Sequence, residues 1–299
     1  MTNKIDLSII ILNYNTKEYL KDCLLSIQKS DTDGFVYETI VVDNNSTDGS
    51  VEAILGYKDI KILRNKKNLG FAAGNNVGVK KSTGRYVLFL NPDTVLEKNT
   101  LKEMVKFMDN QRRAGVATCK LVLPSGKLDE SCHRGFPTPW NALSHFSGLE
   151  KIFPRSKLFS GYLLGYLDKA RTHQIDSACG AFMMVRRSAG ETIGWWDESY
   201  FWYGEDLDFS YRIKEKGWQI FFVPSQKILH YKGAASGIKK HTQNISTANE
   251  QTKIRSIKSS TQVMRIFYQK HYLNKNPRLI TWIVLRGIDL IEKIRLSRI

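Results

Sequence analysis

The chain has 299 residues, 42% of them hydrophobic, and its 45 Lys and Arg residues against 29 Asp and Glu residues give a formal net charge of +16. This composition permits a large core and favours anionic partners, among which nucleic acid, an acidic membrane surface and phosphate-bearing substrates all qualify. Four widely spaced cysteines argue against a zinc site or a disulfide framework. The sequence contains neither a recognisable signal peptide nor an apolar run long enough to cross a membrane. A cytoplasmic protein is therefore expected.

Short apolar strands alternate with helices over the first hundred residues. The strands are expected at 7–12, 38–43, 60–63 and 86–90, and the helices at 16–29, 50–55 and 70–81. Continuous apolar strands separated by helices predict an α/β fold with a mostly parallel sheet and helices on both faces. In such a fold, ligands bind at the carboxyl ends of the strands.

The pattern is less regular beyond residue 100. A helix is expected at 101–111 and a strand at 115–123. Residues 124–175 follow, rich in aromatic residues, Gly and Pro without clear periodicity, and we expect them near the ligand site, although the sequence leaves open whether they close over it as a lid. Alternation resumes with a strand at 178–185, a helix at 206–216 and a strand at 219–223.

The segment from residue 239 to the C-terminus is strongly basic. It holds 13 Lys and Arg residues against three acidic ones, and 13 minus three places about +10 of the formal charge in roughly the last fifth of the chain. Within it, residues 279–285 lead into Ile288, Ile291 and Ile294 at helical spacing. An apolar helix face that includes Trp282 and is flanked by Arg and Lys predicts a helix lying in the interface of an anionic membrane. The alternative is that this helix packs on the rest of the chain.

Two acidic residues follow strands whose carboxyl ends meet in the predicted sheet. Asp43 ends the strand at 38–43, and Asp93 follows the strand at 86–90. A carboxylate at the first position could accept the N3–H of a uracil or thymine ring, and one at the second could hold a divalent cation that bridges two phosphates. Each could equally belong to an ordinary turn.

The densest chemical signal is the run Glu205-Asp206-Leu207-Asp208, which follows four aromatic residues at 200–203. Acidic residues favour the first turn of a helix. Three of them among four residues, beside aromatic rings suited to sugars, indicate a carboxylate that takes a proton from an attacking hydroxyl. His230 is a further candidate, although a single histidine is more often structural than a ligand.

These motifs in this order resemble the inverting glycosyltransferases of family 2. The quoted segments are VVDNNSTDGS around Asp43, FLNPDT around Asp93 and YGEDLDFSYRIKEKGW around Asp206. The loop NLGFAAGNN at 68–76 is similar to one in the bacterial rhamnosyltransferase-like branch, and the resemblance covers roughly residues 5–235. It implies a GT-A fold over residues 1–238, with a nucleotide-sugar-binding half at 1–123, an acceptor-binding half at 124–238 and a basic helical extension at 239–299.

The resemblance also implies roles for particular residues. Asp206 would be the catalytic base with Glu205 beside it, and Trp202 and Tyr203 would contact the acceptor. The donor nucleotide sugar would be bound by Asn13, Asp43, Asn68, Asn75, Asn91, Asp176 and Gly180.

The implied cofactor is Mg²⁺ or Mn²⁺, held by Asp93 and His230. Asn91 departs from the family pattern, because it stands where many members have the first Asp of an Asp-x-Asp motif. Its neutral oxygen leaves the metal with one fewer charged ligand, so the metal stoichiometry stays open.

The expected reaction is transfer of a sugar, with inversion, from a nucleoside diphosphate to an acceptor hydroxyl. The branch favours dTDP-rhamnose as donor and a lipid-linked or polysaccharide acceptor in cell-surface glycan synthesis, with the enzyme at the inner face of the plasma membrane. A UDP-sugar-dependent enzyme of the same family and a catalytically inactive nucleotide-sugar-binding scaffold remain alternatives. We expect no nucleic-acid partner, since that would leave the acidic clusters without a role, and a nicotinamide dehydrogenase would need a Gly-x-Gly-x-x-Gly motif where residues 12–16 read Leu-Asn-Tyr-Asn-Thr.

Overall fold

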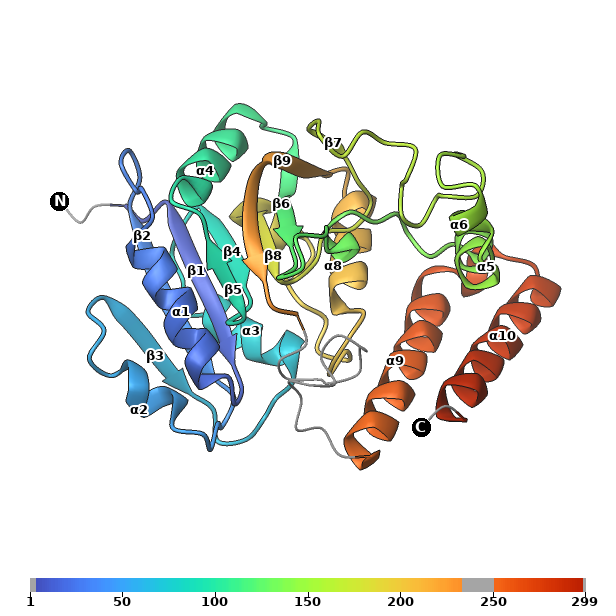
Figure 1. The fold of residues 1–299 in the computed structure, drawn as a ribbon, viewed down its shortest axis with the longest axis horizontal. Coiled ribbons are helices and arrows are strands. Elements are labelled where there is room, and N and C mark those ends of the chain that lie inside the picture. Colours follow the sequence, from blue (N-terminus) through green and yellow to red (C-terminus); the bar gives the residue numbers. More distant parts are fainter. Residues whose placement is uncertain (1–3, 233–249, 298–299) are drawn as a thin grey trace.

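The computed structural model describes residues 4–232 and 250–297 (Figure 1). The predicted boundary between residues 238 and 239, and the first basic residues of the extension, Lys239 and Lys240, lie outside the described residues.

The described residues form a nine-stranded sheet at the centre of the molecule (Figure 1). Its strands follow the order β3-β2-β1-β4-β8-β6-β9-β5, and β7 pairs with β9 beside this path. The strands are β1 (Leu7–Asn13), β2 (Tyr37–Asp43), β3 (Ile60–Arg64), β4 (Tyr86–Leu90), β5 (Thr94–Leu96), β6 (Ala114–Val122), β7 (His173–Gln174), β8 (Phe182–Arg186) and β9 (Gln219–His230).

Strand direction brings several chain segments to one edge of the sheet. β1 pairs in parallel with β2 and β4, and β2 pairs in parallel with β3, as the sequence predicts. β8 runs antiparallel between β4 and β6, with Phe182 opposite Leu90, so the start of β8 lies where β4 ends. β9 is parallel to β6 and antiparallel to β5, which places His230 opposite Thr94. The ends of β1, β2, β4 and β9 and the start of β8 therefore share one edge.

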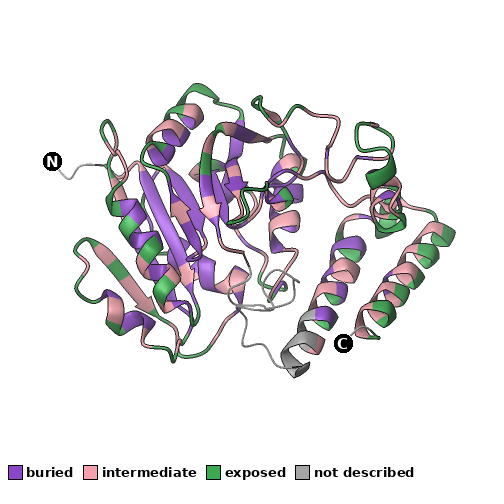
Figure 2. Cartoon of the chain, in the orientation of Figure 1, coloured by how far each residue is buried: buried purple, intermediate pink, exposed green. Residues whose placement is uncertain are grey.

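The helices are α1 (Lys17–Gln28), α2 (Ser50–Ile54), α3 (Phe71–Val79), α4 (Thr100–Asn110), α5 (Pro139–Ser147), α6 (Leu149–Ile152), α7 (Arg187–Thr192), α8 (Glu205–Glu215), α9 (Glu250–His271) and α10 (Arg278–Leu296), with short 3₁₀ turns at Glu130–Cys132 and Leu273–Lys275. Of these, α1, α3, α4, α7 and α8 pack against the sheet, whose strands β1, β4 and β8 are buried over most of their length (Figure 2).

Two glycines let α3 approach β1 closely. A Cβ atom on Gly74 would lie 2.5 Å from Leu12 Cδ1, and one on Gly78 would lie 2.6 Å from Ile10 Cγ2. The alternate residues Ile9 and Ile11 of β1 are also fully buried, so this strand is covered on both faces. Burial on both faces explains why four consecutive residues of this strand, 9–12, are apolar.

The strands β9, β8 and β5 differ from the prediction. β9 continues to His230 instead of ending at residue 223, because a register shift opposite Cys119 and Lys120 accommodates the polar residues that interrupt its apolar pattern. β8 begins at Phe182 rather than at residue 178, and the residues before it make isolated contacts such as the bridge between Ser177 and Arg134. β5 was not predicted, since three residues are too few to show a period.

The C-terminal segment forms a helical hairpin whose first helix packs on α8. Tyr211 of α8 is buried with Phe267, Tyr268 and Tyr272, and His271 Nε2 lies 2.8 Å from Asp208 Oδ1. α10 lies along α9 (Figure 1), and within residues 4–232 and 250–297 no helix is long and apolar enough to cross a membrane. The amphipathic helix predicted at 279–294 is α10, and its Val284 and Leu285 pack against the cluster around Tyr211.

Candidate active site

Asn13 and Asp43 meet at the ends of β1 and β2, where they are opposite one another in the strand register. Asn13 Nδ2 donates to Asp43 Oδ1 at 2.9 Å, and the backbone N–H of Ser46 donates to Asp43 Oδ2 at 2.9 Å. Both side chains are almost completely buried. The carboxylate is therefore held in one orientation at the edge of the sheet by donors on both of its oxygens.

The loop before α3 is tied to this edge by amide side chains. Asn44 Nδ2 donates to Asn68 Oδ1 at 3.2 Å and to the Gly70 carbonyl at 3.1 Å. Gly70 has a φ of +82°, and a Cβ atom there would lie 2.5 Å from the carbonyl oxygen of Phe201. Asn68 is therefore a loop-forming residue in this structure, and the loop contacts the aromatic segment that precedes α8.

Asn75 and Gly180 both contact Phe71, the first residue of α3. Asn75 Nδ2 donates to the Phe71 carbonyl at 3.0 Å within α3. A Cβ atom on Gly180 would lie 2.9 Å from the Phe71 ring. The backbone N–H of Asn91 donates to the Ala181 carbonyl, which joins the end of β4 to the start of β8.

Asp93 and His230 are brought together from distant parts of the sequence. His230 Nε2 lies 3.5 Å from Asp93 Oδ1, and His230 Nδ1 lies 2.9 Å from Asp129 Oδ2. Asp129 is fully buried and also pairs with Lys232. Asp129 was not predicted from the sequence. It lies in the non-periodic segment at 124–175, where no pattern distinguishes it from a surface acid.

Burial and charge set the protonation of this cluster. Burial alone would lower the pKa of His230, but hydrogen bonds to Asp129 and Asp93 outweigh it and raise the pKa to about 9. Burial would likewise raise the pKa of Asp129, yet its hydrogen bond to His230 and the charge of Lys232 hold that pKa far below its usual range. Without a metal ion the surroundings of His230 therefore favour the protonated ring, and a metal ion bound at Nε2 would displace that proton.

Asp93 and His230 supply two suitable ligands for a divalent cation, which is fewer than such an ion needs. A carboxylate and an imidazole are both ligands for such ions, and a second nitrogen held by a buried carboxylate is typical of metal-binding histidines. Within the described residues, no group of three or more His, Cys, Asp and Glu side chains could hold a metal ion. Phosphate oxygens and water would have to complete the coordination, as is common for Mg²⁺.

Asp206 lies at the start of α8, where it pairs with Arg134. Arg134 Nη2 donates to Asp206 Oδ2 at 2.7 Å, and both side chains are largely buried. The neighbouring Glu205 is also buried, and its Oε2 atom has no hydrogen-bond partner among the described residues. Burial and the nearby charge of Asp206 raise the pKa of Glu205 to about 8, so Glu205 is protonated at neutral pH. Arg134, like Asp129, lies in the non-periodic segment and was not predicted.

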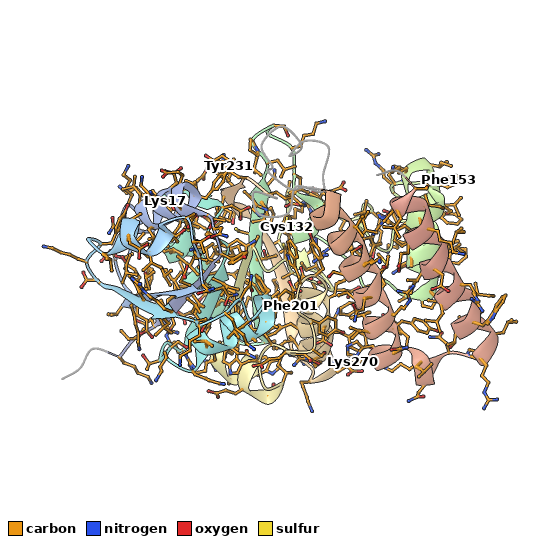
Figure 3. All side chains as sticks on the ribbon, turned by 90° about the horizontal axis from the view of Figure 1, so that it is seen from below. Lys17, Cys132, Phe153, Phe201, Tyr231 and Lys270 are labelled. Carbon is orange, nitrogen blue, oxygen red and sulfur yellow. The ribbon has the colours of Figure 1, made fainter. Side chains whose placement is uncertain are left out.

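Two aromatic side chains stack in the turn directly before α8. The Trp202 and Tyr203 rings stack at 4.9 Å with an interplanar angle of 8°. Tyr203 and Gly204 both have positive φ, 74° and 75°, so the chain turns sharply before the first helical residue. This turn places the stacked pair shortly before Glu205 in the chain, and Phe201, which is exposed, is labelled near the middle of the view in Figure 3.

Asp176 stands beside this group but is committed to other partners. It pairs with Lys214 of α8 and accepts a hydrogen bond from the Phe136 N–H at 3.3 Å. Its own N–H donates to the Arg134 carbonyl, so Asp176 and Arg134 are neighbours. The predicted site residues thus fall into linked groups along one edge: Asn13 with Asp43, Asn68 and Gly180 with the loop before α3, Asp93 with His230, and Asp176 with Arg134 and Asp206.

Comparison with known families gives a match over most of the chain. Residues 8–194 match the model of the family described as Glycosyl transferase family 2. Among curated relatives, "Low-salt glycan biosynthesis hexosyltransferase Agl10" of Haloferax volcanii is 29% identical over 71% of this chain, which spans 62% of the Agl10 length. "Rhamnosyltransferase WbbL" of Escherichia coli is 25% identical over 75% of this chain and 82% of its own length. The "N-acetylglucosaminyl-diphospho-decaprenol L-rhamnosyltransferase" of Mycobacterium tuberculosis is 26% identical over 77% of this chain and 78% of its own.

Solved structures share the fold at lower identity. A crystal structure of GalNAc-T7 with UDP, GalNAc and Mn²⁺ superposes with a TM-score of 0.58 at 16% identity, over 91% of this chain and 59% of that chain. The crystal structure of S. aureus TarS gives a TM-score of 0.57 at 16% identity, over 98% of this chain and 54% of that chain. These likenesses confirm the predicted GT-A fold.

Proposed function

The chain belongs to glycosyltransferase family 2, and we propose that it transfers one sugar, with inversion, from a nucleoside-diphosphate donor to a hydroxyl of a lipid-linked or polysaccharide acceptor. The donor we propose is dTDP-rhamnose, which two relatives named as rhamnosyltransferases support. The observation that carries the proposal is the meeting of Asp93 and His230, 3.5 Å apart, at the edge where β4 and β9 end. The same edge holds Asp43, and Asp206 opens the helix that follows the aromatic segment.

Asp43 is suited to recognise a pyrimidine base. A carboxylate can accept about four hydrogen bonds, and Asn13 and Ser46 use two of them. The remaining capacity can accept the N3–H of thymine or uracil, a charge-assisted bond that a cytosine ring lacks the donor to make. Thymine and uracil share the N3–H and differ only by the methyl group at C5, so this contact would not distinguish them and UDP sugars are the second candidate donors.

Asp93 and His230 would hold the metal of this enzyme. When bound there, Mg²⁺ or Mn²⁺ supplies positive charge to the diphosphate leaving group. Asp129 keeps the His230 ring oriented toward Asp93 through its bond to Nδ1. The neutral side chain of Asn91 contributes no charge to this site, and its backbone carbonyl accepts a hydrogen bond from the Thr94 hydroxyl at 2.7 Å.

Asp206 is the group we assign as the base. The acceptor oxygen forms a bond to the anomeric carbon while the bond from that carbon to the diphosphate oxygen breaks, and the acceptor proton passes to Asp206. Arg134 fixes the orientation of the carboxylate through Oδ2. Glu205, protonated beside it, can donate a hydrogen bond to an acceptor oxygen, and Trp202 with Tyr203 offers a stacked aromatic surface for the sugar.

A transfer assay with a panel of donors tests the proposal. Purified protein with Mn²⁺ and a membrane extract as acceptor source should incorporate label from dTDP-rhamnose, and less from UDP-glucose, UDP-N-acetylglucosamine or GDP-mannose. Incorporation from a UDP sugar alone would show that the donor is a UDP sugar, and the proposed class of reaction would stand. Nucleotide binding without turnover of any donor would indicate an inactive scaffold and contradict the proposal.

A further inference from the structure

One end of the molecule carries exposed apolar side chains on two elements that are far apart in sequence. On α10 the exposed side chains include Leu279, Trp282, Ile283, Leu290 and Ile294, with exposed fractions between 41% and 66%. On α5, α6 and the loop after them they include Trp140, Leu143, Phe146, Ile152, Phe153 and Leu158, between 43% and 67%. α10 and α5–α6 lie at the same end in Figure 1, and Figure 3, seen at right angles, places Phe153 at that end as well.

The face of α10 that carries these residues is the one turned away from the protein. Val284 and Leu285 contact the aromatic cluster around Tyr211, and Ile288 is buried. Residues 279, 283, 286, 290 and 294 recur at intervals of three or four, so they follow one another along the opposite side of the helix. The predicted amphipathic helix therefore exists, but it is apolar on both sides: one side packs on α9 and the other faces solvent.

The exposed charges on this end are mostly positive. Arg286 and Lys293 are exposed within the stripe on α10, and Lys151, Arg155 and Lys157 are exposed on α6 and the loop after it. The acidic residues of α10, Asp289 and Glu292, both pair with Arg265 of α9, and Asp289 also lies 3.6 Å from Arg286. The acidic residue of residues 139–158, Glu150, is only 2% exposed and lies 2.6 Å from His145 Nδ1.

We infer that this end, formed by the outer face of α10 and by α5–α6 with residues 153–158, lies in the interface of an anionic lipid bilayer. Aromatic and aliphatic side chains flanked by Lys and Arg insert into the headgroup region of such membranes and attract acidic lipids. The inference rests on the proposed function, since a lipid-linked acceptor would be displayed at that surface. It adds that segment 124–175 contributes to the contact together with the tail.

A second copy of the chain fits this end less well. In a two-fold dimer the same patch meets itself, so Lys293, Lys151 and the other exposed basic residues would face a second patch that is also mainly basic, with Asp289, already paired with Arg286, as the partly exposed acid of α10. An anionic lipid surface supplies the missing negative charge. Charge complementarity therefore selects the bilayer as occupant.

Vesicle co-sedimentation of the full-length protein tests the inference. Wild type should bind vesicles of phosphatidylcholine mixed with phosphatidylglycerol, and should bind less at high salt or with phosphatidylcholine alone. W282D/L290D on α10 and I152D on α6 should each weaken binding by about tenfold or more, because an aspartate neither inserts nor attracts acidic lipid. L55D is the matched control, since Leu55 is 62% exposed beyond the end of α2, away from this patch.

Three results would overturn the inference. Wild type could fail to bind the mixed vesicles, or both patch variants could bind as well as L55D does. Alternatively, sedimentation without lipid could show a dimer that W282D/L290D disperses, which would assign the patch to a second copy. Thermal stabilisation by dTDP, measured on the same preparations, separates these results from a failure of the proposed function, because the nucleotide site does not include the patch.

Discussion

Asp206 and Arg134 depend on one another, because each would otherwise be a buried charge without a partner. Asp206→Asn should lower turnover by about 10²–10⁴-fold, the usual contribution of a general base, while dTDP affinity stays unchanged. The variant should also be less stable, since Arg134 loses its partner. R134M/D206N removes both charges and should recover stability without recovering turnover. Near-normal turnover in a folded Asp206→Asn protein would remove Asp206 from the role of base.

Asp129 is expected to act on metal binding through His230. Asp129→Asn keeps the size of the side chain but weakens the bond that orients the ring, so the Mn²⁺-dependent part of dTDP affinity should fall by about 10–100-fold. Affinity measured by calorimetry with excess chelator should hardly change. Equal losses with and without Mn²⁺ would show that Asp129 supports the fold of the site rather than the metal.

The raised pKa of Glu205 predicts a pH dependence of stability. Its pKa rises from 4.5 to about 8 on folding, so the folded state binds the proton more tightly and the resulting stabilisation is lost as the pH rises between these values. Glu205→Gln removes this contribution while keeping a similar shape. The melting temperature of the variant should therefore fall less than that of wild type between about pH 5 and pH 8. Parallel curves for the two proteins would contradict the assignment of a protonated Glu205.

At the scale of elements, the contact between α9 and the turn before α8 makes a prediction about Gly204. Gly204 has a φ of +75°, and a Cβ atom there would collide with Val263 Cγ1 of α9. Gly204→Ala should cost about 1–2 kcal/mol from the backbone and a further 1–3 kcal/mol from overpacking. Gly217→Ala is the control, since φ is +82° with open space around it, so only the first cost applies. V263A should relieve the second cost in the double variant, and equal melting temperatures for the two glycine variants would show that α9 does not pack there.

Some strands and site residues could be predicted from the sequence and others could not. The strands β1, β2 and β4 each contain a run of three or more apolar residues, so their positions, with Asp43 at the end of β2 and Asp93 just after β4, follow from local pattern. The extension of β9 to His230 does not, because it depends on pairing with β6 and β5 across a register shift. Asp129 and Arg134 lie in a segment shaped by contacts with distant residues, so local periodicity carried no signal for either.

At the scale of the whole molecule, the C-terminal hairpin is part of the folded protein. Removing residues after 249 would expose Tyr211 of α8 and its neighbour Leu207. The loss of several buried aromatic contacts should lower the free energy of unfolding by several kcal/mol, on the order expected for that apolar area. The melting temperature and solubility of residues 1–249 would show this. An unchanged melting temperature would mean that the hairpin is a detachable attachment.

We propose that the edge of the sheet binds a pyrimidine nucleoside diphosphate together with a divalent cation. Thermal unfolding tests this binding most directly. The protein is melted with dTDP, UDP, GDP or CDP, each with Mn²⁺ or with chelator. A nucleotide at about 100 times its dissociation constant should stabilise the fold by about 2.7 kcal/mol. We expect stabilisation by dTDP and UDP that increases with Mn²⁺, and little by CDP, whose base has no N3–H to donate to Asp43. A folded protein whose melting temperature none of the four nucleotides changes, with or without Mn²⁺, would contradict it.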